Sequence, residues 1–360
     1  MPGDGIGPEV VQQAVRIAGK AAEIAGSRIA FDIYHGGARY WQRNKHQREW
    51  EPEVFEKCKS ANAILIGPIG LPGAKYPDGR TVGGKIVFGL RMGLDLYANV
   101  RPAKLFPGVK SALTNKTDND IDLVVVRENT EDLYAGIQGS LSRNQTEEMA
   151  IDVGVTTAKG AERIIDYAFK IASKRSGRSS DKKKQVTCVD KSNVLSGSLL
   201  FRSIFEKVSK KYPKIKDDYA FVDAMTQWMI RKPEDYDVIV TTNLFGDILS
   251  DLAAGIVGGL GLTPSGNIGN SRAMFGPVHG SAPAHAGKNV ANPVAAILSA
   301  AMMFEWLAEK HIDHRIEICA RLIRKATIST LRDPANHTTD LGGYSSTSKI
   351  SQTIQKNIVQ

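Results

Sequence analysis

Short apolar runs alternate along the chain with stretches in which apolar residues recur at helical spacing. The apolar runs predict β-strands at Arg28–Ile33, Ala63–Ile66, Asp122–Arg127, Gln185–Val189, Tyr219–Val222 and Asp237–Thr241. The helical spacing predicts helices at Pro8–Ala25, Thr157–Lys174, Ser196–Lys211, Gly246–Ala254, Pro293–Lys310 and His314–Ile328. Such alternation is typical of an α/β protein in which helices cover a sheet.

The composition is that of a soluble globular protein. With 360 residues, of which 42% are hydrophobic and 24% charged, the chain is long enough for two domains or one large α/β unit. No apolar run is long enough to span a bilayer, so we expect no membrane partner. Cys58, Cys188 and Cys319 are too few and too far apart for a disulfide framework or a zinc site, which favours a reducing compartment. The N-terminus has no apolar signal core, and we expect a cytoplasmic protein.

A net charge of +9 raises the question of a nucleic-acid partner. Much of the excess lies in Ser173–Lys184, a polar basic stretch between a predicted helix and a predicted strand. No aromatic residues interleave with it, and the chain has no zinc-finger or RNA-binding motif. We therefore interpret the stretch as a solvated loop and expect no nucleic-acid partner. The remaining positive charge suits attraction of a small anionic substrate.

The stretch Thr241–Asp251 carries the strongest chemical signal. Asp247 and Asp251 are four residues apart, so both carboxylates lie on one face of a helix, about 5–6 Å apart at Cβ. Two such charges repel each other unless a cation lies between them, and Mg²⁺ takes one or two carboxylates plus water and substrate oxygens. The helix follows a buried-type strand, and ligands of α/β sheets bind at that end. We predict metal ligands here rather than a solvated acidic face.

The chain opens with a glycine loop, Pro2–Glu9, which reads PGDGIGPE and places Pro8 in the first turn of a helix. The spacing G-x-G-x-G differs from the fingerprint of a Rossmann dinucleotide site. The loop suits either an anion or nucleotide at a helix N-terminus or a tight turn. Only Met1 precedes it, so we expect that a first strand is missing.

Several further motifs occur in one order along the chain. They are Arg91–Pro102 (RMGLDLYANVRP), Arg127–Gly136 (RENTEDLYAG), Asp190–Asn193 (DKSN), His279–Pro283 (HGSAP), Gly287–Pro293 (GKNVANP) and Asp340–Gly343 (DLGG). With PGDGIGPE and NLFGDILSD, they resemble the β-decarboxylating dehydrogenases of the isopropylmalate/isocitrate dehydrogenase family over essentially the whole chain.

The resemblance implies a two-domain α/β fold with a large mixed sheet flanked by helices, which is not a Rossmann fold. Residues 1–96 and 258–360 would form a cofactor-side domain, and residues 97–257 a substrate and dimerisation domain. The resemblance also implies an NAD(P)-linked oxidative decarboxylation of a 2-hydroxy acid. That reaction would take place in a homodimer with shared active sites.

The resemblance implies that Arg91, Arg101 and Arg127 bind the substrate carboxylates. The chemistry agrees, because a planar guanidinium forms paired hydrogen bonds with a carboxylate. Arg127 ends an apolar strand, where an ordinary surface arginine is not expected.

Acid–base and metal roles follow from the same resemblance. It implies that Tyr134 is the general acid and Lys191 the general base, aided by Asp223. A lysine beside another cation can have a lowered pKa and so act near neutrality. Mg²⁺ or Mn²⁺ would be held by Asp223, Asp247 and Asp251. Lys191 and Asp223 would reach the site from the partner subunit.

For the cofactor, the resemblance implies contacts from Ile6, His279, Gly280, Ser281, Ala282, Pro283, His285, Asn292 and Asp340. The chain departs from the family at two positions. Gly276 replaces the usual Glu before PVHG, and Ala284 replaces the Asp that holds the ribose hydroxyls in NAD-using members. Loss of that carboxylate removes the repulsion of a 2′-phosphate. His285 then contacts a phosphate or is an ordinary surface histidine, and both NAD and NADP remain open.

Substrate choice depends on the segment before Arg91. Isocitrate-using relatives carry Ser and Asn where this chain has Lys85 and Val87. Val87 and Phe88 suit an apolar wall for an isopropyl group, which favours 3-isopropylmalate. Lys85 could pair with a third carboxylate, which leaves isocitrate, homoisocitrate or tartrate as alternatives. A non-catalytic regulatory subunit is the alternative of a different class, because Gly276 is a lost acidic residue.

Overall fold

The computed structural model describes residues 1–143 and 146–359. They form two compact units. Unit 1 comprises Met1–Leu96, Leu105–Asp118 and Ala254–Gln360, and unit 2 comprises Tyr97–Lys104 and Asn119–Ala253. Each unit combines strands with covering helices.

Unit 1 has a three-stranded region built on long helices. Strand β1 (Ile64–Leu65) lies parallel to β10 (Ala273–Pro277), which is antiparallel to β9 (Pro264–Ile268). Helix α9 (Val294–His311) packs on β9, on β10, on α1 (Gly7–Ile24) and on α10 (His314–Leu331). Because α9 is apolar on nearly all sides, it is the central buried helix of this unit.

The remaining helices of unit 1 are α2 (Ala38–Arg43), α3 (Val54–Ser60), α4 (Gly84–Gly93) and α11 (Thr347–Lys356). Its short 3₁₀ turns are Leu260–Leu262, Pro283–His285, Pro334–Asn336 and Thr339–Leu341. Across residues 1–143 and 146–359, no helix is long and apolar enough to cross a membrane.

The main part of unit 2 has five strands in the order β2-β3-β8-β6-β7. Strand β2 (Ala98–Lys104) is antiparallel to β3 (Asp122–Glu128), while β3, β8 (Val238–Thr241), β6 (Gln185–Asp190) and β7 (Lys216–Phe221) are mutually parallel. The central strands are buried on both faces, as parallel strands covered by helices require. Their carboxyl ends meet at one edge, so this edge collects the residues that follow each strand.

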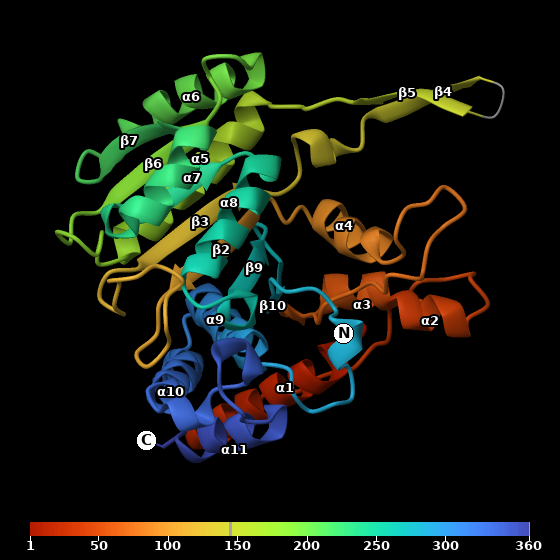
Figure 1. The fold of residues 1–360 in the computed structure, drawn as a ribbon, viewed down its shortest axis with the longest axis vertical. Helices are drawn as coiled ribbons and strands as arrows, with labels where there is room; N and C mark the ends of the chain where they lie inside the picture. Colours follow the sequence, from red (N-terminus) through yellow and green to blue (C-terminus); the bar gives the residue numbers. More distant parts are fainter. Residues whose placement is uncertain (144–145, 360) are drawn as a thin grey trace. The chain divides into compact units, whose positions relative to one another are not determined.

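The helices of unit 2 are α5 (Ala158–Lys174), α6 (Ser196–Ser209), α7 (Val222–Arg231) and most of α8 (Asn243–Ile256), and its 3₁₀ turns are Leu133–Ala135 and Pro233–Asp235. The strands β4 (Gln138–Arg143) and β5 (Thr146–Asp152) pair as an antiparallel arm that extends away from the five-stranded part (Figure 1). Every residue of these two strands is exposed, including Leu141, Met149 and Ile151.

The predicted fold class is confirmed: the chain has a mixed α/β fold with a large mixed sheet flanked by helices. All six predicted helices are present, with ends that shift by up to three residues. The predicted strand Arg28–Ile33 is wrong: it has no pairing partner in the structure, and Ile33 is 62% exposed. The predicted strand Tyr219–Val222 begins earlier, at Lys216, because Val222 is already the first residue of α7.

Candidate active site

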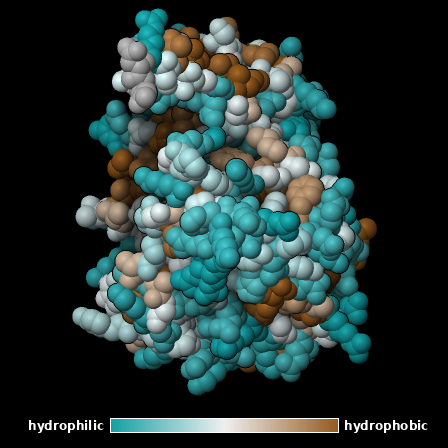
Figure 2. Space-filling view, turned by 90° about the vertical axis from the view of Figure 1, so that its right-hand side faces the viewer, coloured by the Kyte–Doolittle hydropathy of each residue, from teal (hydrophilic) through white to brown (hydrophobic). Residues whose placement is uncertain are grey.

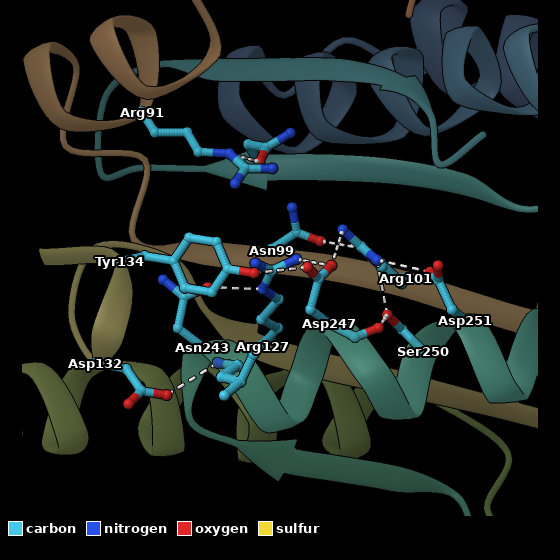
Figure 3. Close-up of polar contacts among 12 residues, drawn as sticks. Arg91, Asn99, Arg101, Arg127, Asp132, Tyr134, Asn243, Asp247, Ser250 and Asp251 are labelled. Atoms are coloured by element: carbon cyan, nitrogen blue, oxygen red, sulfur yellow. Dashed lines mark hydrogen bonds and ion pairs between the residues drawn. The ribbon is translucent and has the colours of Figure 1, made fainter. Parts of the chain in front are cut away.

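Arg127 lies near the carboxyl end of β3 and is only 1% exposed. Its Nε donates to Asn243 Oδ1 at 2.8 Å, and its Nη1 donates to Asp247 Oδ1 (Figure 3). Burial and the nearby charge of Arg101 lower the pKa of Arg127 to about 10, although Asp247 opposes the shift. The guanidinium therefore remains charged at neutral pH.

Arg101 comes from the middle of β2 and points to the same face of that strand as Asn99, two residues earlier. Its Nε donates to Asn99 Oδ1 at 2.8 Å, and its Nη1 donates to Ser250 Oγ at 2.8 Å. The same guanidinium lies 3.2 Å from Asp247 Oδ1 and 3.2 Å from Asp251 Oδ1. Two arginines and two aspartates thus form one cluster in which the charges balance.

Tyr134 joins this cluster through its hydroxyl, which donates to Asp247 Oδ2 at 3.0 Å. Its ring also lies 5.2 Å from the guanidinium carbon of Arg127, within cation–π range. The structure therefore brings five predicted site residues into one cluster within unit 2: Arg101, Arg127, Tyr134, Asp247 and Asp251 (Figure 3).

The start of α8 is held by hydrogen bonds to residues Glu131 and Asp132, far away in the chain. Asp132 Oδ2 accepts from the Leu244 N–H at 2.9 Å, and Asn243 Nδ2 donates to the Glu131 carbonyl at 3.1 Å. A Cβ on Gly246 would lie 2.6 Å from the Arg127 side chain, so only glycine permits this close approach. The NLFGD sequence thereby holds α8 directly against Arg127.

The carboxylates of Asp247 and Asp251 suit a hard divalent cation. Both side chains are solvent-accessible and share one helix face. Burial and repulsion by Asp247 raise the pKa of Asp251, while Arg101 opposes the shift. In the described ranges, no three His, Cys, Asp or Glu side chains gather as metal ligands. Two carboxylates with water and substrate oxygens nevertheless make an acceptable Mg²⁺ site. A contribution from Asp223 of a partner subunit stays a prediction.

Lys191 and Asp223 form a pair of their own in unit 2. Lys191 Nζ lies 2.6 Å from Asp223 Oδ1, and this hydrogen bond lowers the pKa of Asp223. Lys191 directly follows Asp190, a fully buried carboxylate that pairs with Arg202 through two contacts of 2.7 and 3.0 Å. Asp190 also accepts from the Ser192 N–H at 2.8 Å. These bonds hold the backbone that carries Lys191.

Several residues that hold the arginines were not predicted from the sequence, namely Asn99, Asn243 and Ser250. Each had a usable signal. Asn99 stands two residues before Arg101 on the same strand face, and Asn243 begins the helix that carries both aspartates. Ser250 immediately precedes Asp251.

In unit 1, the opening glycine loop packs against the HGSAP segment. The Ile6 N–H donates to the Ser281 carbonyl at 2.8 Å, and a Cβ on Gly5 would lie 1.9 Å from that oxygen. The loop is therefore a tight turn that allows close approach of two backbones. Nearby in sequence, Ala282 has a left-handed backbone and precedes the 3₁₀ turn Pro283–His285, and Gly280 lies two residues before Ala282.

Two further predicted cofactor residues contact each other. Asn292 Nδ2 donates to Asp340 Oδ2 at 3.0 Å, and Thr338 Oγ1 donates to Asp340 Oδ1 at 2.5 Å. Burial lowers the pKa of His279, whose Nε2 is buried without a hydrogen-bond partner in the described chain. His285 is exposed.

Gly276, the first departure from the family pattern, has a steric explanation. A Cβ at this position would lie 2.4 Å from the Ile66 carbonyl oxygen. A glutamate side chain at position 276 is therefore incompatible with the backbone packing of β10 against Ile66 in this chain.

The segment before Arg91 forms helix α4. Arg91 Nε donates to Asn267 Oδ1 at 3.0 Å, and its guanidinium lies 5.8 Å from the Phe88 ring. Phe88 is partly exposed, and Val87 is half-buried. Lys85 Nζ lies over the Tyr76 ring, 4.3 Å from its centroid.

The chain is similar to known dehydrogenases over most of its length. The family model for isocitrate/isopropylmalate dehydrogenase matches residues 1–356. A 3-isopropylmalate dehydrogenase from Bifidobacterium longum is 45% identical over 311 residues, which cover 85% of this chain and 86% of that protein. A 3-isopropylmalate/3-methylmalate dehydrogenase from Methanocaldococcus jannaschii is 39% identical, over 99% of this chain and 97% of that protein. The crystal structure of isocitrate dehydrogenase from Methylococcus capsulatus matches with a TM-score of 0.85 and 39% identity, over 100% of this chain and 98% of that one.

The fold and these relatives define an oxidoreductase of the β-decarboxylating dehydrogenase class. Members of this class use a divalent metal ion and NAD or NADP, and they act on small hydroxy acids. The chain belongs to the isocitrate/isopropylmalate dehydrogenase family.

Proposed function

We propose that this chain oxidises and decarboxylates 3-isopropylmalate. The observation that carries the proposal is the cluster in which Arg101 and Arg127 are neutralised by Asp247 and Asp251. Two adjacent guanidinium groups match a dicarboxylate, and two adjacent carboxylates match a divalent cation. On binding, the two substrate carboxylates would pair with Arg101 and Arg127, and the metal ion would pair with Asp247 and Asp251. These contacts would replace the ion pairs of the free protein.

The residues of unit 2 supply the groups that the reaction needs. Lys191, hydrogen-bonded to Asp223, would accept the hydroxyl proton while the hydride leaves the same carbon. Tyr134 would then protonate the carbon from which CO₂ has departed. When bound, the metal stabilises the enolate charge and the nicotinamide accepts the hydride. The hydrogen bond between Tyr134 and Asp247 would hold the phenol beside the reacting carbon.

The environment of Lys85 favours an alkyl substrate over a third carboxylate. Its ammonium group already lies over Tyr76 and interacts with the charge of Glu49. Phe88 and Val87 present apolar surface on the same helix. Burial of an unpaired carboxylate against such surface costs several kcal/mol, whereas an isopropyl group gains roughly 1–3 kcal/mol over a smaller substituent.

Isocitrate is the second candidate, because the structure of an isocitrate dehydrogenase superposes on the whole chain. Lys85 is exposed and could turn toward a third carboxylate. Homoisocitrate and tartrate remain further alternatives within the same chemistry.

For the cofactor, we propose NAD or NADP bound by the HGSAP segment and the Asn292–Asp340 pair. Ala284 supplies no carboxylate against a 2′-phosphate, and His285 is exposed beside it. Position 284 therefore admits both NAD and NADP.

We also propose a homodimer that shares its active sites. Unit 2 exposes many large apolar side chains, including Val194, which is 69% exposed, and Leu195, Leu199, Trp228, Ile230 and Ile248. Figure 2 shows brown, apolar side chains gathered in the upper part of the face that it displays. With the exposed arm β4–β5, such surface is typical of a subunit interface. Lys191 and Asp223 lie among these residues in sequence and would enter the partner's site.

One assay matrix tests the proposed function. The purified protein is assayed with 3-isopropylmalate, isocitrate, malate and tartrate, each with NAD and with NADP, in the presence of Mg²⁺ or Mn²⁺. We expect 3-isopropylmalate to exceed malate and tartrate by at least about tenfold in kcat/KM. A preference for isocitrate would replace the proposal with its second candidate. Absence of turnover with all four acids would contradict the proposed substrate class.

A further inference from the structure

Unit 1 contains a cavity that shares only Lys85 with the candidate substrate residues. It has a volume of about 1010 Å³ and lies among the loop that follows α2, the start of α3, the turn around Tyr76 and the start of α4. Its walls are aromatic: Trp41, Trp50, Phe55 and Tyr76 all line it. Trp41 and Tyr76 meet edge to face with their centroids 5.8 Å apart, so the rings form a fixed apolar frame.

Glu49 lines this cavity and is only 7% exposed. Its Oε2 accepts from the Gly83 N–H at 3.2 Å, but its Oε1 is buried without a hydrogen-bond partner in the part of the chain that the structure describes. Burial raises the pKa of Glu49, and the charge of Lys85 and the backbone N–H groups of Gly83 and Ile86 oppose the shift. A buried carboxylate oxygen without a donor is costly, which indicates that something else supplies the donor.

A second polar atom of the cavity, the hydroxyl of Tyr76, is also buried without a hydrogen-bond partner among the described residues. Lys85, which is exposed, interacts with both residues. Its Nζ lies over the Tyr76 ring, 4.3 Å from the centroid, and its charge lowers the pKa of Glu49. Because Lys85 is exposed, its ammonium group can move into solvent, and another cation can then bind over the Tyr76 ring.

The charge of the lining decides between ligand classes. Four glutamates line the cavity, against two lysines and one arginine. Acidic excess together with aromatic faces attracts cations, because each ring face carries a negative quadrupole. A divalent metal ion would have to exchange oxygen ligands and water for aromatic carbon, and an anion would meet an excess of carboxylates.

We propose that this cavity binds a small organic cation, an amine or amidine on a flat apolar body. Its N–H groups would donate to Glu49 Oε1, and its body would lie among Trp41, Trp50 and Tyr76. The bound cation would take the place of the Lys85 ammonium over the Tyr76 ring. This proposal does not depend on the proposed dehydrogenase reaction, and its test measures binding alone.

The test is calorimetric titration of the purified protein with three molecules of nearly the same shape: benzamidine (cationic), benzamide (neutral) and benzoate (anionic). We expect benzamidine to bind one site per chain, with a Kd of about 1 mM or lower. Benzamide should bind at least about tenfold more weakly, because it lacks the charge-assisted hydrogen bond. Benzoate should not bind.

Two substitutions should act in opposite directions. Glu49→Gln should weaken benzamidine binding at least about tenfold, whereas Lys85→Gln should strengthen it, because the competing cation is gone. Glu23→Gln, at an exposed position of α1, is the matched control and should leave binding unchanged. Circular dichroism checks that each variant is folded. If Glu49→Gln does not fold, Lys85→Gln alone still gives the sign of the effect, since Lys85 is exposed.

Three results would overturn the proposal. One is benzoate binding as tight as that of benzamidine. Another is weaker benzamidine binding by Lys85→Gln, which would contradict displacement of the Lys85 ammonium by the ligand. The third is absence of benzamidine binding up to about ten times the expected Kd.

Discussion

Arg127 and Asn243 join the end of strand β3 to the first residue of helix α8. The Nε of the buried arginine donates to Oδ1 of the asparagine at 2.8 Å, although 116 positions separate them in the chain. Because Arg127 is 1% exposed, this donor has no access to water. The asparagine amide therefore fixes the orientation of the guanidinium that is proposed to meet the substrate.

Asn243→Ala should lower kcat/KM for the hydroxy acid by about 10–100-fold, mainly through KM. The reason is that a hydrogen bond to a charged group contributes about 1.5–3 kcal/mol. Steady-state kinetics with varied substrate measures the effect. The KM for the nicotinamide cofactor serves as the internal control and should not change. An unaltered KM for the hydroxy acid would show that Arg127 is held without Asn243.

Asp247→Asn and Asp251→Asn should each weaken Mn²⁺ binding by at least about 100-fold, since even residues that only orient metal ligands account for 10–100-fold. Titration of the substrate-free protein by electron paramagnetic resonance measures free Mn²⁺ directly. Asp152→Asn, on the exposed strand β5, is the matched control. Full turnover of the wild-type protein in excess EDTA, with no metal carried by the protein, would contradict a metal role for these residues.

Mixing Tyr134→Phe protein with Lys191→Met protein should restore part of the activity that each variant lacks alone. In a dimer with shared sites, one of the two sites in a mixed dimer combines an intact Tyr134 with an intact Lys191. The assay follows activity after the two variants have exchanged subunits, with exchange verified by native mass spectrometry. No recovery after verified exchange would mean that both residues act within one chain.

Arg175→Met should destabilise the protein by about 3–5 kcal/mol, because it leaves a buried charge without its partner. Arg175 Nε lies 2.6 Å from Asp237 Oδ1, and Asp237 is fully buried. Urea unfolding of wild type and variant measures the loss. The double variant Arg175→Met/Asp237→Asn is the control and should recover much of it. Equal stabilities of the single and double variants would contradict a charge-based cause.

Asp122 should make the free energy of unfolding depend on pH in the acid range. Burial alone would raise the pKa of Asp122, but the charges of Arg175 and Lys104 outweigh it and hold the pKa below its ordinary value. Such a carboxyl stabilises the fold above its unfolded-state pKa, and this contribution is lost as pH falls through the folded-state pKa. Acid unfolding should therefore be less steep in Asp122→Asn than in wild type. Parallel curves would assign the acid sensitivity to other carboxyls.

The sequence pattern predicted that Arg127 ends an apolar strand and that Asp247 and Asp251 share one face of a helix. Both are local signals, because they depend only on residues close in the chain. It did not predict that Arg101 would meet Asp251. These residues are 150 positions apart, and only the pairing of β2 with β3 brings the arginine under the helix. From the sequence, a divalent ion was expected to supply the charge between the two aspartates, and this metal role stays a prediction. In the structure the guanidinium groups of Arg101 and Arg127 lie against Asp247.

Other elements were not predictable from local pattern. Strands β9 and β10 read PSGNI and AMFGP, in which glycine and proline give little strand propensity, yet each pairs with the other through five residues. In the segment Arg28–Ile33 the local pattern favours a strand that the structure does not form. The apolar residues of this segment suit a strand, but no neighbouring strand pairs with it in the structure.

The pairing of Arg101 with Asp247 and Asp251 has a thermodynamic consequence for the proposed function. A substrate carboxylate that captures the guanidinium frees the aspartates, and a cation that captures the aspartates frees the guanidinium. Each ligand thus removes the internal competitor of the other. Because linkage between two binding equilibria is reciprocal, the factor by which metal tightens substrate binding must equal the factor by which substrate tightens metal binding.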